Sequence, residues 1–166
     1  PRGAGPWERP AVLLVDMQDA YLRAPDDPRE GMRWAEFYDR LERVVMPSAT
    51  RLLAAARRSG IDVAFARTAC LTGDGRDRPR RQSRLGRNAP PLTLDSPESR
   101  IVAPLSPAPG EIVAIKTADS ALVGTGLARA FRNMGANPVI VGGIFTDQCV
   151  SSTVRSLFDE GFDVVV

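Results

Sequence analysis

The stretch Ala11-Val-Leu-Leu-Val15, followed at once by the polar run Asp16-Met-Gln-Asp19, decides the fold class of this chain. A short, continuously apolar run between polar residues is typical of a strand inside a parallel sheet that is covered on both faces. A strand with one face in water would instead alternate apolar and polar residues. We therefore expect residues 11–15 to form a buried strand that ends directly before Asp16.

Apolar patterns along the rest of the chain predict further strands and helices in alternation. The strands are expected at 61–66, 111–116, 138–143 and 162–166, and the helices at 37–45, from Pro47 to Gly60, at 127–134 and at 150–158. The order is β-α-β, a long excursion, then β-α-β-α-β. This order predicts a doubly wound, three-layer α/β/α fold with a mainly parallel sheet, of the Rossmann-like kind. The length fits one domain over residues 1–166, whose C-terminus could be incomplete.

Composition restricts the chemistry. The sequence contains no histidine, two cysteines, and a single lysine, Lys116, among its 22 Lys and Arg residues. Ser-His-Asp and Cys-His machinery and imidazole zinc sites are therefore excluded, and we expect neither a metal nor a cofactor. Acid–base chemistry must come from Asp, Glu, Tyr, Cys or the one lysine.

Charge and apolar content indicate the class of partner. A net charge of +2 is too small to argue for nucleic acid or a membrane surface. The apolar runs are far shorter than a membrane-spanning helix, and no signal-peptide pattern opens the chain. We therefore expect a cytoplasmic protein with reduced cysteines that acts on a small molecule.

Ligands of such folds bind beyond the carboxyl ends of the strands, where Asp16, Arg67, Lys116 and Gly143 are predicted to lie. The turn after Gly143 leads to Cys149. If Thr146 caps the helix that follows, the thiol lies in the first turn, where free N–H groups and the helix dipole favour thiolate. The same N–H groups could receive an oxyanion. Alternatively, Cys149 is a small apolar residue on a core-facing helix.

Lys116 and Asp16 complete a candidate catalytic set. An ammonium near the thiol lowers the thiol pKa, whereas the alternative is a solvated surface lysine. A lysine in a chain that otherwise uses arginine favours a site that needs a compact ammonium. Asp16 could take the thiol proton and return it to a leaving amine, or it could only cap the next turn.

Three segments resemble the signature segments of the isochorismatase-like cysteine hydrolases. They are Ala11-Val-Leu-Leu-Val-Asp-Met-Gln-Asp19, Ile115-Lys-Thr-Ala-Asp-Ser-Ala-Leu122 and Gly142-Gly-Ile-Phe-Thr-Asp-Gln-Cys-Val-Ser-Ser-Thr153. Together they extend over nearly the whole chain from residue 10. The resemblance implies an Asp-Lys-Cys triad, with Asp16 as general acid and base, Lys116 stabilising charge and Cys149 as nucleophile at a C–N bond.

The same resemblance implies the surroundings of the triad. The bond between Ile144 and Phe145 would be a cis peptide, and the backbone N–H groups of Phe145 and Cys149 would form the oxyanion hole. The residues expected to contact substrate are Gln18, Tyr21, Arg67, Ile144 and Thr146. For Gln18 a hydrogen bond within the turn is the alternative, and for Tyr21 simple packing.

The departures from the family pattern narrow the activity. Without histidine, the metal site of the nicotinamidase branch cannot form. Isochorismatases proper, which cleave a vinyl ether, typically lack the cysteine, so Cys149 favours an amidase-type member. We expect a metal-independent hydrolase that cleaves a small carboxamide, ureido compound or lactam through a thioester. The alternatives are a vinyl-ether hydrolase that uses Asp16 as acid, and a non-catalytic binding or assembly module. The family also implies a homodimer or homotetramer.

Residues 68–110 interrupt the regular pattern and contain half of the 14 prolines. Such long segments are usually lids or mobile loops, so we expect substrate selectivity to lie here. Cys70 is interpreted as a spectator, with a redox-sensitive thiol as the alternative. The basic residues 76–87 are interpreted as a solvated loop, with an anion clamp or a weak RNA contact as the alternatives.

Overall fold

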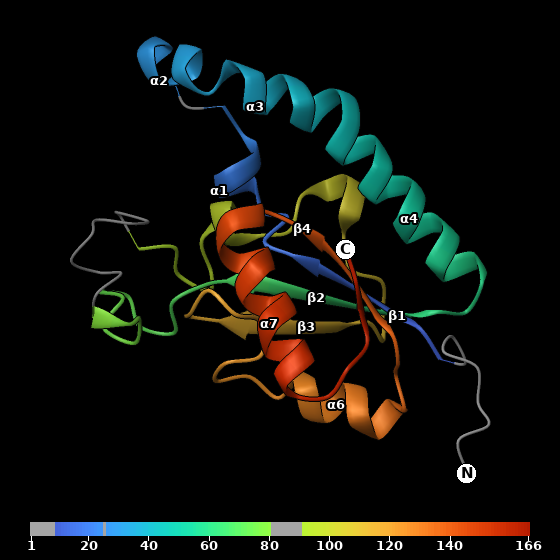
Figure 1. Ribbon diagram of the computed structural model, residues 1–166. Helices are drawn as coiled ribbons and strands as arrows, with labels where there is room; N and C mark the ends of the chain where they lie inside the picture. The colour runs from blue at the N-terminus through green and yellow to red at the C-terminus, as the bar shows by residue number, and fades with distance from the viewer. Residues whose placement is uncertain (1–8, 25, 81–90) are drawn as a thin grey trace.

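The computed structural model describes residues 9–24, 26–80 and 91–166. Its centre is a five-stranded parallel sheet in the order β3-β2-β1-β4-β5 (Figure 1). The strands are β1 (Ala11–Val15), β2 (Asp62–Thr68), β3 (Ile112–Lys116), β4 (Val139–Gly143) and β5 (Val164–Val165). All five residues of β1 are buried, and β1 pairs with β2 on one side and β4 on the other. The prediction of a buried parallel strand is confirmed, and the structure places it at the centre of the sheet.

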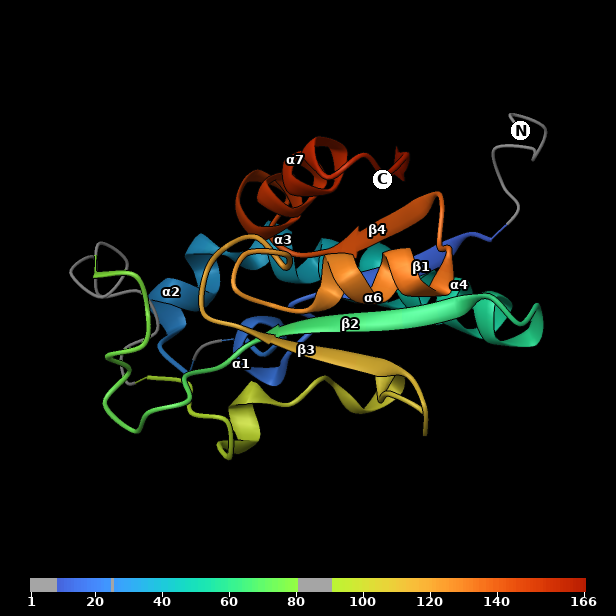
Figure 2. The same cartoon turned by 90° about the horizontal axis from the view of Figure 1, so that it is seen from below.

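Helices cover both faces of this sheet (Figures 1 and 2). On one face, α4 (Met46–Arg58) packs its Leu53 against Val12 and Leu14 of β1. On the other, α6 (Leu127–Met134) and α7 (Ser151–Asp159) share a core with Leu13. The remaining helical elements are α1 (Asp19–Leu22), α2 (Pro28–Arg33), α3 (Ala35–Arg40), η1 (Leu41–Val45), η2 (Pro97–Ser99), η3 (Ala103–Leu105) and η4 (Thr146–Val150). The prediction of a three-layer α/β/α fold is confirmed. Within the described ranges, no helix is long and apolar enough to cross a membrane.

The helix break predicted at Pro47 is wrong, because α3, η1 and α4 follow one another without a gap. η1 is a π-helical turn in which the N–H of Met46 donates to the carbonyl of Leu41, five residues back. Pro47 is the second residue of α4 and directly follows this π-helical turn. The π-helical turn of η1 thus accommodates Pro47 within one continuous helical segment made of α3, η1 and α4.

The second half of the excursion is built into the core. Leu105 is fully buried in the core cluster beneath α4, and the N–H of Val102 donates to the carbonyl of Met17 (2.9 Å). Cys70 is buried and forms a β-bridge with Thr93, and burial raises the pKa of its thiol. Residues 91–110 are therefore part of the fold and not a lid. Most of the basic stretch 76–87 lies outside the described residues.

Gly143, the last residue of β4, is the position where we expect a small substitution to be most harmful to folding. Its φ is +131°, and an added Cβ would lie 2.1 Å from the carbonyl oxygen of Val15 on β1. Gly143→Ala therefore has to push two central strands apart, and we expect it to lower the free energy of unfolding by about 3 kcal/mol or more. Thermal unfolding followed by circular dichroism measures this.

Gly73→Ala is the matched control, because its added Cβ meets no atom within 4 Å. We expect that variant to unfold near the wild-type temperature. Equal unfolding temperatures for the two variants would contradict the close approach of β1 and β4 at Gly143.

Candidate active site

Asp16, Lys116 and Cys149 meet at the carboxyl edge of the sheet. The Lys116 Nζ lies 2.8 Å from Oδ2 of Asp16 and 3.3 Å from Sγ of Cys149. Asp16 directly follows β1, Lys116 is the last residue of β3, and Cys149 lies in η4, one turn after β4. Parallel strands β1, β3 and β4 thus bring three residues from distant parts of the sequence within contact distance, as the strand-end argument predicts.

The ammonium of Lys116 is buried and surrounded by acceptors. Besides Asp16 and Cys149, it donates to Oγ1 of Thr68 (2.9 Å) and to the carbonyl of Ala118 (3.1 Å). A buried ammonium is stable only when it is paired and hydrogen-bonded in this way. The alternative of a solvated surface lysine is wrong, since Lys116 is 1% exposed.

The carboxylate of Asp16 faces the site and not its own turn. Asp16 has a left-handed backbone (φ +54°), which aspartate tolerates better than most residues. Its Oδ1 accepts from the N–H of Thr68 (3.1 Å) and from Oγ1 of the same threonine (3.1 Å). Thr68 therefore bridges the acid and the lysine, a role the sequence analysis missed.

The sequence features that favour thiolate at Cys149 do not determine its ionisation in the folded protein. Burial and the negative charge of Asp16 raise the pKa of the thiol to about 12 and outweigh the lowering by Lys116. Burial disfavours the charged form of any group, and a neighbouring carboxylate adds repulsion. The predicted cap is also absent: Thr146 is the first residue of the π-helical η4, and Phe145 is the N-cap without a side-chain hydrogen bond. The resting side chain is a protonated thiol beside a carboxylate that can accept its proton.

The turn between β4 and Cys149 contains a cis peptide between Ile144 and Phe145, as the resemblance implies. The N–H of Ile144 donates to the carbonyl of Val15 (3.1 Å), which ties the turn to β1. The carbonyl of Phe145 accepts the N–H groups of Gln148 (3.1 Å) and Val150 (3.2 Å). The role of the Phe145 and Cys149 N–H groups as an oxyanion hole stays a prediction.

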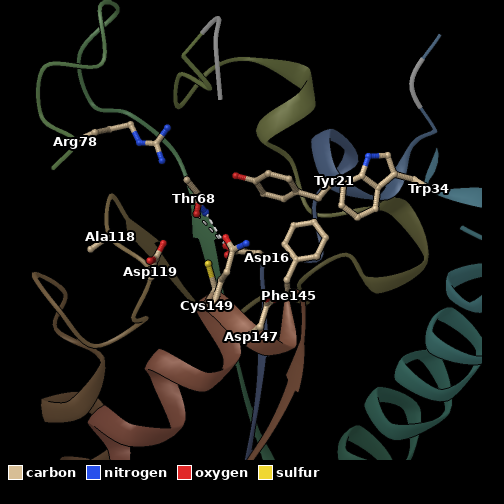
Figure 3. A pocket seen from close by; sticks show the side chains of 11 residues that line it. Asp16, Tyr21, Trp34, Thr68, Arg78, Ala118, Asp119, Phe145, Asp147 and Cys149 are labelled. Atoms are coloured by element: carbon tan, nitrogen blue, oxygen red, sulfur yellow. Dashed lines mark hydrogen bonds between the residues drawn. The ribbon is translucent and has the colours of Figure 1, made fainter. Parts of the chain in front are cut away.

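A pocket of about 440 Å³ opens above the thiol (Figure 3). Its lining consists of Asp16, Tyr21, Trp34, Thr68, Arg78, Ala118, Asp119, Phe145, Asp147, Gln148 and Cys149. Two of the catalytic candidates reach it directly, whereas Lys116 lies beneath it. Within the described ranges, no group of three or more cysteine and acidic side chains is placed to hold a metal ion.

Of the five residues predicted to contact substrate, only Tyr21 lines this pocket. Arg67 points away from it and donates to the carbonyl of Ser99 (3.1 Å) and to that of Leu94 (3.3 Å). Ile144 is buried in the core beside α4, and Thr146 is exposed outside the pocket.

Gln18 is buried below the pocket and positions Thr68. Its Oε1 accepts the N–H of Thr68 (2.7 Å), and its Nε2 donates to the carbonyls of Thr68 (2.9 Å) and Ser99 (2.7 Å). Three hydrogen bonds of a buried amide fix the threonine that links Asp16 and Lys116. Gln18 is thus a positioning residue for the site rather than a residue of its lining.

The pocket residues that the sequence analysis missed lie on elements whose placement depends on the fold. Trp34 joins α2 to α3, Arg78 lies in the excursion, and Asp119 follows β3 by three residues. These positions carry one local signal of a pocket residue. Each is a polar or aromatic residue just beyond a strand end or in a long insertion.

Comparisons with known proteins show which family this chain belongs to. The isochorismatase domain model matches residues 10–166. The chain is 27% identical over 159 residues to a streptothricin hydrolase of Streptomyces noursei, covering 94% of this chain and 47% of that protein. It is 27% identical over 169 residues to an N-carbamoylsarcosine amidase of an Arthrobacter species, covering 99% of this chain and 60% of that protein. The chain thus spans about half to three fifths of the length of these relatives.

Solved structures give the same result for the fold. An isochorismatase family protein from Desulfovibrio vulgaris superposes with a TM-score of 0.74 at 30% identity, over 93% of this chain and 76% of that one. A cysteine hydrolase from Pseudomonas syringae superposes with a TM-score of 0.77 at 24% identity, over 94% and 68% of the two chains.

Proposed function

Because this chain belongs to the isochorismatase family, we propose that it is a cysteine hydrolase that cleaves the C–N bond of a small carboxamide, ureido compound or lactam. The observation that carries this proposal is the buried contact of Lys116 with both Asp16 and Cys149 at the floor of a pocket. The names of the two relatives, a hydrolase and an amidase, support the same class of reaction.

The reaction begins with attack of the Cys149 sulfur on the substrate carbonyl carbon. Because the pKa of the thiol is about 12, the S–H proton has to pass to Asp16 as the S–C bond forms. The carbonyl oxygen becomes an oxyanion, which the backbone N–H groups of Phe145 and Cys149 receive. Lys116 keeps a positive charge beside the reacting sulfur while the negative charge moves from Asp16 to the oxyanion.

The tetrahedral intermediate then collapses. The C–N bond breaks, Asp16 gives its proton to the leaving nitrogen, and a thioester on Cys149 remains. Water attacks the thioester with Asp16 as base, and the cleaved S–C bond returns the thiol together with the acid product. Asp16 thus acts twice as base and twice as acid in one cycle.

A mass measurement tests this proposal. The protein is mixed with a primary carboxamide, a ureido acid or a lactam, quenched in acid, and weighed intact. A turned-over substrate is expected to add the mass of its acyl group, and peptide mapping is expected to place that mass on Cys149.

Cys70→Ala is the control, because Cys70 is the other thiol in the chain, is buried, and is not part of the pocket lining. That variant is expected to carry the same adduct. Turnover with an adduct on Cys70, or with none at any quench time, would contradict the thioester mechanism.

A further inference from the structure

One side of the pocket is aromatic. Figure 3 shows the rings of Tyr21, Trp34 and Phe145 on one side of the thiol, and Arg78 and Asp119 on the other. The Tyr21 and Phe145 rings contact edge to face, with centroids 6.0 Å apart. We refer to Tyr21, Trp34 and Phe145 as the aromatic wall.

The wall is supported from behind by Phe37 of α3. Its ring centroid lies 5.5 Å from that of Phe145 and 6.3 Å from that of Trp34. Ring pairs at these separations attract each other, so the three wall residues are held as one packed cluster with Phe37. The wall is therefore formed before a ligand arrives.

Trp34 is the wall residue with the most surface left to cover, since it is 45% exposed. Its indole N–H donates to Oε2 of Glu30 (3.3 Å), and the guanidinium of Arg33 lies 5.6 Å from its ring centroid. These contacts with α2 and the Phe37 contact orient the ring. Because the indole N–H is already engaged, the ring offers apolar surface to the pocket.

The chemistry of the proposed reaction determines what faces this wall. The leaving nitrogen must approach Asp16 to receive a proton, and the oxyanion must approach the turn that contains Phe145 and Cys149. The third substituent of the carbonyl carbon, the carbon group of the acyl part, then extends into the open pocket. A volume of about 440 Å³ is much larger than an acetyl group needs.

We propose that Trp34 determines specificity, and that the aromatic wall selects carboxamides whose acyl group carries a large apolar substituent, such as a ring or a branched alkyl group. This inference rests on the proposed function, because the orientation of the substrate follows from that reaction. A packed ring on the acyl group covers the exposed surface of Trp34 and removes apolar area of both partners from water.

Two amides that differ only in the acyl group test the wall: acetamide and cyclohexanecarboxamide. Trp34→Ala is expected to lower kcat/KM for cyclohexanecarboxamide by about tenfold or more, through KM, which is the size of one good ring contact. For acetamide, kcat/KM is expected to stay within about twofold of wild type, since its methyl group is too small to reach Trp34. Trp34→Phe keeps a ring and is expected to restore most of the loss.

Met32→Ala is the matched control, because Met32 is exposed on α2 beside Trp34 and is not part of the pocket lining. It is expected to leave both amides unaffected. An equal loss for both amides in Trp34→Ala, or no loss for either, would overturn the role of Trp34 while leaving the hydrolase proposal in place.

Measuring ligand binding in an inactive variant tests the aromatic wall independently of the reaction. Trp34 is one of two tryptophans, and the other, Trp7, lies outside the described residues. In a Cys149→Ala, Trp7→Phe protein, cyclohexanecarboxamide is expected to change the fluorescence of Trp34 at lower concentration than acetamide does. If wild type hydrolyses neither amide, this titration still tests the wall, and equal titrations for the two amides would overturn it.

Discussion

Replacing Cys149 by alanine is expected to abolish C–N bond hydrolysis, with turnover falling by roughly 10⁴-fold or more. Alanine removes the only atom in the site that can form the thioester, and no other thiol lines the pocket. Release of ammonia from a primary amide measures the loss at substrate saturation. The acyl adduct is expected to disappear from the intact mass spectrum in the same variant.

The fold should survive this change. Lys116 keeps Asp16, Thr68 and the Ala118 carbonyl as acceptors when the sulfur is removed, so its charge stays compensated. Circular dichroism and the unfolding temperature check this. Cys149→Ser is a second variant, whose hydroxyl is a weaker acid than the thiol and is expected to restore little activity.

Full activity in Cys149→Ala would contradict the cysteine mechanism. Activity that survives in Cys149→Ala but is lost in Asp16→Ala would instead select vinyl-ether hydrolysis, in which the aspartate alone supplies a proton. A folded wild-type protein with normal thiol reactivity that turns over no carboxamide, ureido acid or lactam would select the non-catalytic module. The same set of variants therefore separates the three functions that the sequence leaves open.

The central strand and the meeting of the triad were predictable because both depend on local signals. A buried parallel strand has a recognisable apolar run, and the ends of such strands meet at one edge wherever the helices lie. Asp16 and Lys116 each occupy a strand end, and the glycine-rich turn marks the approach to Cys149. None of these arguments needs a distance between side chains.

Arg67 and Thr68 show what local sequence signals do not predict, namely which side chain of a buried strand faces the pocket. They are neighbours at the end of β2, and successive residues of a strand point to opposite faces, so only one of them can reach the pocket. In a strand buried on both faces, the sequence carries no alternation that says which one does. The side chain of Thr68 turns toward Asp16, and that of Arg67 turns toward Ser99.

The ionisation of Cys149 was not predictable for a related reason. The helix start and the lysine are visible in the sequence, and both favour thiolate. Burial of the thiol and its closeness to Asp16, 133 positions earlier in the chain, appear only in the folded protein, and they raise the pKa to about 12. The sign of the shift is thus set by the tertiary structure.

The raised pKa of Cys149 leads to the second large expected effect. Asp16→Asn is expected to change the reactivity of the thiol and the rate of hydrolysis in opposite directions. Asparagine removes the charge and the carboxylate hydrogen bond that raise the pKa of Cys149, and it leaves the lowering by Lys116. The pKa of the thiol is therefore expected to fall, while burial continues to raise it. Alkylation by iodoacetamide at pH 9 is expected to become faster than in wild type, where a pKa of about 12 leaves about one thiol in a thousand ionised.

Hydrolysis is expected to change in the opposite direction, with kcat falling by about 10³-fold or more, because asparagine can neither take the thiol proton nor protonate the leaving nitrogen.

Asp62→Asn is the matched control, since it removes one carboxylate at the first residue of β2, at the opposite end of that strand from Thr68. That control is expected to leave both the alkylation rate and kcat near wild type. If Asp16 carried no proton in the cycle, alkylation would still become faster, because Asp16 raises the thiol pKa by more than Lys116 lowers it, but kcat would stay near wild type. Opposite changes in the two rates therefore identify Asp16 as the group that moves the proton.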